Sequence, residues 1–281
     1  MFVLLALGSA LIYGAADFIG GLTSRRADTI AIVLISQTAG LLLASALVLV
    51  DSTSRPGAGD WLWGGLAGLA GGVGVGLLYR ALAVGVMAVV APTTAVCAVV
   101  VPVVFALAVG ERPALPESAG IMIAILAILL VSQQAPSAAG PAVVGKNSSG
   151  IGLALAAGVA IGFFFLALAN TTPGAGLWPL VAARVASVAL FSVVAILSRP
   201  SLRMAWNLVL FVVAGGVLDM LANLLYLFAT RTGPLTLAVT LASLYPASTV
   251  LLARLVLQER LTARQWGGVV LALAAIVLIV A

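Results

Sequence analysis

The sequence predicts an all-α transmembrane protein in which ten helices form two inverted five-helix repeats. Of the 281 residues, 63% are hydrophobic and only 7% are charged, whereas a soluble domain carries roughly 25% charged residues. Apolar runs of about 20 residues, long enough to cross the bilayer core as helices, recur from Phe2 to Ala281. No segment alternates apolar and polar residues as the strands of a transmembrane barrel do. A soluble domain and a barrel are therefore excluded.

Polar turns separate the apolar runs and set the number of spans. They contain turn and charge signals such as Pro56-Gly57, Thr172-Pro173-Gly174 and Arg199-Pro200. The longest break runs from Gln134 to Ser149, is rich in Ala, Pro, Gly and Ser, and follows the fifth span. The predicted spans are residues 2–22, 29–50, 61–81, 87–109, 117–133, 151–169, 177–198, 207–229, 234–257 and 265–281.

Prolines and glycines refine this pattern. Pro246 predicts a kink in the ninth span, because proline has no N–H for the helix ladder. Pro92 and Pro102 bracket part of the fourth span, where two interpretations stay open: a break that exposes backbone to a substrate, or ordinary packing of small residues. The run from Gly64 to Gly76 lacks the Lys-Ser/Thr of a phosphate-binding loop, so we expect it to serve close helix packing.

The two halves of the chain match at a nearly constant offset. Glu111-Arg112 is matched by Glu259-Arg260, 148 residues later, which is a specific match because charged residues are scarce. Since five spans is an odd number, the second half enters the membrane in the opposite sense to the first. We therefore expect a first repeat at 1–133, a linker at 134–150 and a second repeat at 151–281.

Ten spans in two halves, each with Glu-Arg before a glycine-bearing last helix, resemble the drug/metabolite transporter superfamily, and in particular its EamA-type branch. The resemblance covers nearly the whole chain. It implies a ten-helix transporter that exports or exchanges amino acids, drugs or other small metabolites, with both termini in the cytosol. Its most specific motifs are Leu78-Tyr79-Arg80-Ala81-Leu82 with Gly85, and Ser243-Leu244-Tyr245-Pro246 followed by Leu257-Gln258-Glu259-Arg260-Leu261.

The distribution of basic residues points to the opposite orientation. Nine Lys and Arg residues lie in or beside the breaks after odd-numbered spans, and three lie beside the others. The positive-inside rule then places both termini outside. The second break, with Asp51, Arg55 and Asp60, has a net charge of minus one, whereas members of the resembled family usually carry several basic residues there. Both orientations stay open.

Polar residues inside apolar spans are the candidate functional groups, since a charge in hydrocarbon costs at least about 2.5 kcal/mol. Pairs four residues apart share a helix face and are expected to point into the bundle, because lipid offers no hydrogen bonds. The candidate substrate-binding residues are Tyr13, Asp17, Gln37, Arg184, Asp219, Asn223 and Tyr245. An apolar lining is expected from Phe163, Phe164, Leu221 and Tyr226.

The charged candidates allow alternative interpretations. Arg184 is either a bidentate clamp for a carboxylate or phosphate or the partner of Asp219 in a buried ion pair. Asp219 is correspondingly either a proton carrier or amine ligand, or that partner. Asp17 either faces a cavity or pairs with Arg25 or Arg26 at the end of its helix.

These features predict a secondary-active or facilitative transporter of small amphipathic, amino-acid-like metabolites that works as an exporter by alternating access. If Arg184 and Asp219 pair, Asp17 instead favours a lipophilic cation, as in multidrug proton antiport. Two other classes are a membrane scaffold without transport and an intramembrane aspartyl enzyme. The enzyme is disfavoured because neither Asp17 nor Asp219 follows a Gly-x-Gly motif.

No cofactor or metal is expected, because the chain has no histidine and a single cysteine, Cys97. The expected partners are a small-molecule substrate, protons and the lipid bilayer, and the scattered charges form no face for nucleic acid. Asp17 within the first apolar run favours a retained helix over a cleaved leader. We expect a multi-pass protein of the bacterial cytoplasmic (inner) membrane.

Overall fold

The computed structural model describes residues 1–281 except 51–53, 85–86, 132–146, 258–261 and 281. In these residues the regular structure is entirely helical, with a short 3-10 helix at Pro173–Ala175 between two longer helices. The α-helices are α1 (Phe2–Ser24), α2 (Thr29–Val50), α3 (Ala58–Val84), α4 (Met87–Ala108), α5 (Leu115–Val131), α6 (Asn147–Ala169), α7 (Trp178–Ser198), α8 (Trp206–Thr232), α9 (Leu235–Ala242), α10 (Tyr245–Leu257) and α11 (Ala263–Val280).

The all-helical class is confirmed, and each predicted span has its helix, the ninth being divided into α9 and α10. Six helices, α1, α2, α3, α6, α7 and α8, are long and apolar enough to cross a membrane by length and composition. One boundary differs: α6 begins at Asn147, so the last residues of the expected linker 134–150 are helical. The rest of that linker up to 146 lies outside the described residues, as does Glu259-Arg260.

The division of the ninth span follows from Pro246. Helix α9 ends at Ala242 and α10 begins at Tyr245. Pro246 has no N–H to donate to the carbonyl of Ala242, four residues earlier, and its ring clashes with that carbonyl in a continuous helix. The predicted kink is confirmed. Helix α4, in contrast, is continuous from Met87 to Ala108, so the break considered between Pro92 and Pro102 does not occur.

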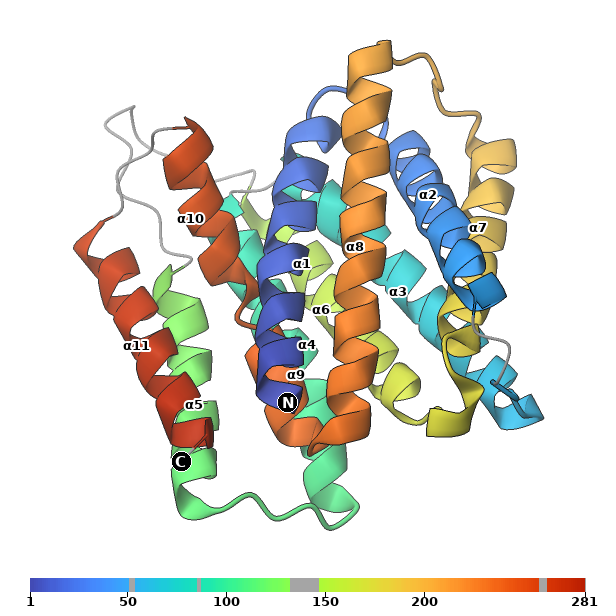
Figure 1. The fold of residues 1–281 in the computed structure, drawn as a ribbon. Helices are drawn as coiled ribbons and strands as arrows, with labels where there is room; N and C mark the ends of the chain where they lie inside the picture. The colour runs from blue at the N-terminus through green and yellow to red at the C-terminus, as the bar shows by residue number, and fades with distance from the viewer. Residues whose placement is uncertain (51–53, 85–86, 132–146, 258–261, 281) are drawn as a thin grey trace.

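The helices form a bundle whose two termini lie at the same end (Figure 1). Helices α1 and α8 lie side by side, while α5 pairs with α11 at one edge of the view and α2 with α7 near the other. Helix α3 packs on both α6 and α7, and α4 packs on α6. Because helices of the first half contact mainly helices of the second half, any space between them is lined from both halves.

Helix α3 approaches its neighbours through glycine. A Cβ on Gly64 or Gly68 would meet backbone atoms of Pro179 or Ala183 in α7, and one on Gly74 would meet Ile161 in α6. The expectation that the glycine-rich run serves close helix packing is therefore confirmed. Residues without side chains allow two backbones to approach at van der Waals distance.

We expect Gly68→Ala to destabilise the protein, because its methyl group has no space against Ala183. Overpacking of this kind costs about 1–3 kcal/mol. Gly65→Ala is the matched control on the same helix, since a Cβ there meets nothing within 4 Å. Thermal unfolding in detergent should show a lower midpoint for Gly68→Ala alone. Equal midpoints for both variants would contradict the packing shown for α3 and α7.

Candidate functional site

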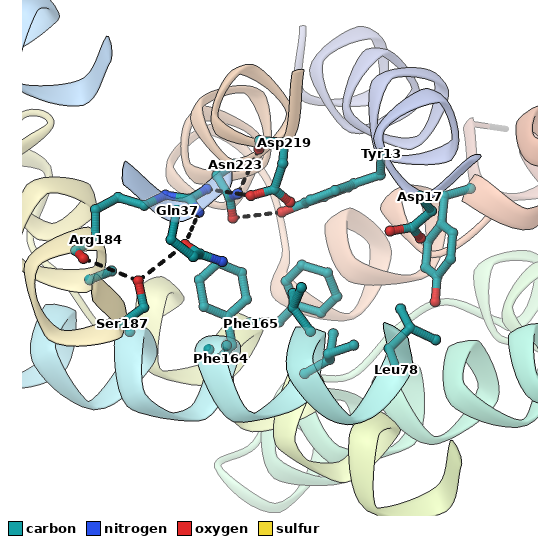
Figure 2. A pocket seen from close by; sticks show the side chains of 17 residues that line it. Tyr13, Asp17, Gln37, Leu78, Phe164, Phe165, Arg184, Ser187, Asp219 and Asn223 are labelled. Carbon is teal, nitrogen blue, oxygen red and sulfur yellow. Dashed lines mark hydrogen bonds and ion pairs between the residues drawn. The ribbon is translucent and has the colours of Figure 1, made fainter. Parts of the chain in front are cut away.

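One pocket between the two halves brings together all seven candidate residues of the sequence analysis. Seventeen residues line it (Figure 2). They come from three helices of the first half and, in the second half, from α6, α7, α8 and α10. The seven are Tyr13 and Asp17 on α1, Gln37 on α2, Arg184 on α7, Asp219 and Asn223 on α8, and Tyr245 on α10.

Arg184 is the centre of the polar side of this pocket. Its Nη2 donates to Oδ2 of Asp219 at 2.5 Å, and its Nη1 donates to Oε1 of Gln37. The residue is only 6% exposed. Gly40 on α2 makes room for it, since a Cβ there would lie 3.1 Å from Nε of Arg184. Of the two interpretations offered for Arg184, the structure has the buried ion pair.

The network extends from this ion pair on both sides. The Asn223 amide donates to the backbone carbonyl of Asp219 at 2.6 Å and to its Oδ2 at 3.3 Å. The Tyr13 hydroxyl in turn donates to Oδ1 of Asn223 at 2.8 Å. On the other side, the Ser187 hydroxyl donates to Oε1 of Gln37 at 3.1 Å. The charges of Arg184 and Asp219 are thus compensated inside the protein.

Ser187 was not among the predicted site residues, although the sequence held a signal for it. It follows Arg184 by three residues on α7, and residues at that spacing share a helix face. Gly68, Gly71 and Gly72 of α3 also line the pocket. The sequence pattern predicts packing alone for that glycine run, whereas in the structure it has both roles, because α3 faces α7 and the pocket together.

Asp17 lies apart from the network. It is one helical turn from Tyr13, is partly buried and lines the same pocket. In the view of Figure 2 it lies on the other side of Tyr13 from Arg184. Among the residues that the structure describes, Asp17 has no hydrogen-bond or ion-pair partner, Arg25 and Arg26 included. Its carboxylate is therefore available to a ligand.

Aromatic rings form the apolar side of the pocket. The ring of Tyr13 meets those of Phe165 and Tyr245 edge-on, with centroids 6.0 Å and 6.4 Å away. Phe164 packs on Phe165 with centroids 5.4 Å apart. All four rings line the pocket that Asp17 enters. Aromatic faces attract cations through their quadrupole, most strongly where water is excluded.

The expected apolar lining was only partly right. Phe164 lines the pocket, whereas Phe163 is 52% exposed and Leu221 does not reach it. Tyr226 is fully buried beyond Phe165 and donates its hydroxyl to the Phe165 carbonyl at 3.1 Å. Three consecutive phenylalanines give no indication of which one faces inward, and Phe165 was missed for this reason.

A second polar network ties loops together at the end that holds the termini. Asp60, in the first turn of α3, accepts hydrogen bonds from the backbone N–H and the hydroxyl of Thr172 at 2.7 Å and 3.1 Å. Arg231, in the last turn of α8, donates to the Thr172 carbonyl at 3.0 Å. Glu111, in the loop after α4, accepts from the N–H of Thr236 at 3.1 Å. These contacts join the two halves at that end.

Chemically, the described residues of the pocket offer one carboxylate without an ion-pair partner, that of Asp17, beside aromatic rings. An organic cation with an apolar body matches this combination, since its charge can meet Asp17 while its body contacts Tyr13, Phe165 and Tyr245. The described residues hold no group of three or more His, Cys, Asp or Glu side chains arranged for a metal ion.

A family model and a solved structure both match nearly the whole chain. The model of the EamA-like transporter family matches residues 1–133 and 148–281. One solved crystal structure aligns with a TM-score of 0.78 over 99% of this chain and 95% of its own, at 19% identity, which shows a shared fold. No curated protein matches the chain.

Proposed function

Since this chain belongs to the EamA-like transporter family of the drug/metabolite transporter superfamily, we propose that it exchanges small lipophilic organic cations for protons across the membrane. The family consists of membrane transporters, which is consistent with a protein that is not an enzyme. The substrate, the coupling and the direction are our proposal. The observation that carries it is the carboxylate of Asp17, which lies in an aromatic pocket and has no partner among the residues that the structure describes.

The pairing of Arg184 favours a cation over an amino-acid-like zwitterion. A zwitterion needs a positive group for its carboxylate, and both Nη atoms of Arg184 already donate to Asp219 and Gln37. Binding a carboxylate there would require breaking a buried ion pair and leaving Asp219 uncompensated, which is costly in a low-dielectric site. A cation requires no such rearrangement, because Asp17 has no ion-pair partner in the described part of the chain.

Proton exchange follows from the same carboxylate. The Asp17 carboxylate holds either a proton or a cationic ligand, so loading one releases the other. If the pocket opens alternately to the two sides of the membrane, an inward proton gradient then drives the cation outward. We propose this export in a bacterial cytoplasmic membrane, with Tyr13 and Tyr245 positioned to contact the cation beside Asp17.

Alternating access is supported by the way in which the two halves pack. In the proposed inverted repeat, residues 1–133 correspond to 151–281, so α1 to α3 correspond to α6 to α8. The packing of α3 on α6 then has its counterpart in α8 on α1, and that of α3 on α7 in α8 on α2. The contacts of α2 with α7 and of α5 with α11 map onto themselves, because the repeat exchanges the two helices of each pair. This pattern is expected of two repeats related by a two-fold axis.

In this mechanism, the network of Asp60, Thr172 and Arg231 closes the end of the bundle that holds the termini. It holds the start of α3, the loop before α7 and the end of α8 together. For the pocket to open towards the termini, these hydrogen bonds must break. Their number is small, which suits an element that opens and closes.

Matched ligands that share a phenyl group test the substrate class. We expect benzyltrimethylammonium, but neither phenylalanine nor phenylpropionate, to raise the thermal unfolding midpoint of the purified protein and to be taken up by proteoliposomes. Uptake should be saturable and should increase when the lumen is acidic, since protons leave as the cation enters. Uptake of phenylalanine with no response to the quaternary amine would instead support the zwitterion transporter. Absence of flux for all three, with the panel widened to larger lipophilic cations, would contradict transport of this class.

A further inference from the structure

The loop after α1 and the start of α8 lie at the end of the bundle opposite the termini (Figure 1). Residues of both segments line a second pocket there. Its polar lining is Arg26, Arg203 and Asn207, and its apolar lining includes Met204, Leu208 and Phe211. It shares no residue with the pocket of Asp17. The transport mechanism above makes no use of it.

Two cationic side chains, those of Arg26 and Arg203, line this pocket. Neither the Arg26 nor the Arg203 guanidinium has a hydrogen-bond or ion-pair partner among the described residues. The nearest acid in the sequence, Asp28, accepts a hydrogen bond from the N–H of Ile30 at 2.9 Å. The pocket therefore presents two positive charges, and a ligand with a phosphate group supplies the matching charge and acceptors.

The start of α8 adds to this positive field. Its N-cap is Ala205, whose methyl side chain accepts no hydrogen bond, while the Asn207 side chain accepts one from the N–H of Leu208 at 2.9 Å. The remaining N–H groups of the first turn, together with the helix dipole, attract an anion. With Arg26 and Arg203 they form three independent sources of positive potential around one pocket.

The surroundings of the pocket indicate that this anion belongs to a lipid. Helix α8 is a candidate membrane span that begins at Trp206, so the pocket lies where headgroups are found. Trp206 is 73% exposed and Phe211 is 61% exposed, and aromatic side chains of this kind gather at the membrane interface. A soluble phosphate would gain nothing from these apolar groups, whereas acyl chains would cover them.

We propose that this pocket binds the headgroup of an anionic phospholipid, with its phosphate between Arg26 and Arg203 and its acyl chains along Phe211. Basic pockets at the cytoplasmic ends of transmembrane helices bind anionic headgroups in this way. The basic end of this molecule is also the one that the positive-inside rule assigns to the cytoplasm. The site is independent of the transported substrate, so it stands even if the proposed function fails.

The test uses the purified full chain in neutral detergent with short-chain phosphatidylglycerol, and phosphatidylcholine as the lipid without net charge. We expect phosphatidylglycerol to raise the unfolding midpoint of the wild type more than phosphatidylcholine does. The variant Arg26→Gln/Arg203→Gln should bind phosphatidylglycerol roughly 30-fold more weakly, about fivefold for each arginine. The matched control is Arg80→Gln/Arg199→Gln, which removes two exposed arginines of the same end that do not line the pocket.

Loss of the phosphatidylglycerol preference in the first variant, with retention in the control, supports the site. Equal loss in both variants would show a diffuse charge effect and overturn it. An unchanged preference in the first variant would overturn it as well. Glycerol phosphate is the soluble competitor: if it binds as well as the lipid does, the ligand is a free phosphate and not a membrane lipid. Unfolding midpoints without lipid show that both variants are folded.

Discussion

Replacing Asp17 with Asn is expected to abolish proton-driven cation uptake while the protein stays folded. Asn has the same shape, and Asp17 has no partner to lose among the described residues. The amide carries no charge, so it neither binds a proton in exchange nor attracts the cation. The affinity for benzyltrimethylammonium should fall about tenfold or more, because the quaternary ammonium, which has no N–H to donate, loses its Coulombic attraction to the carboxylate.

The measurement compares uptake into proteoliposomes with and without an imposed pH gradient. Asp28→Asn is the matched control, because it makes the same chemical change at an exposed position outside the pocket. Asp17→Glu should recover part of the coupling between protons and cation uptake, since it restores the carboxylate on a side chain that is one methylene longer. Gradient-driven uptake that persists at the wild-type rate in Asp17→Asn would reject Asp17 as the proton-exchanging group.

Removing one partner of the Arg184–Asp219 ion pair is expected to destabilise the protein strongly. Arg184→Leu leaves the Asp219 carboxylate with only its bond from Asn223, and Asp219→Leu leaves the guanidinium with Gln37. An uncompensated buried charge costs about 3–5 kcal/mol. The double variant Arg184→Leu/Asp219→Leu should recover most of this loss, because no charge then remains unpaired.

Chemical unfolding in mixed micelles measures the three variants as a double-mutant cycle. Arg80→Leu serves as the control, since it removes an exposed arginine and should change the free energy of unfolding by less than about 0.5 kcal/mol. If Arg184 instead acts as a carboxylate clamp, Arg184→Leu should be nearly as stable as the wild type and lose affinity for phenylpropionate. That result would favour the amino-acid-like substrate class over the cation.

Much of the site could be predicted because of where polar residues stand in an apolar chain. Asp17, Arg184 and Asp219 are conspicuous in spans that contain few other charged groups, and the cost of exposing them to lipid requires that they face inward. The helical spacing of Tyr13 with Asp17, and of Asp219 with Asn223, then placed two pairs on shared faces. All seven candidates line one pocket for this reason.

The ion pair itself could not be predicted from that reasoning. Whether Arg184 reaches Asp219 or stays free depends on the distance and rotation between α7 and α8, and on the gap that Gly40 leaves on α2. Helical periodicity determines which residues share a face of a helix, but it does not determine which other helix packs against that face. The same limit explains Phe163 and Phe165, since adjacent residues of α6 point in different directions and only packing decides which one faces the pocket.

The sequence by itself determined the membrane class, the helices and the residues that cannot face lipid, because each follows from local hydropathy and helical spacing. It also determined the break at Pro246, which depends only on the missing N–H and the ring of proline. The tertiary structure decided which charges compensate one another. It pairs Arg184 with Asp219 and leaves Asp17 without a partner in the described part of the chain, because interhelical contacts depend on side chains that are more than 30 residues apart.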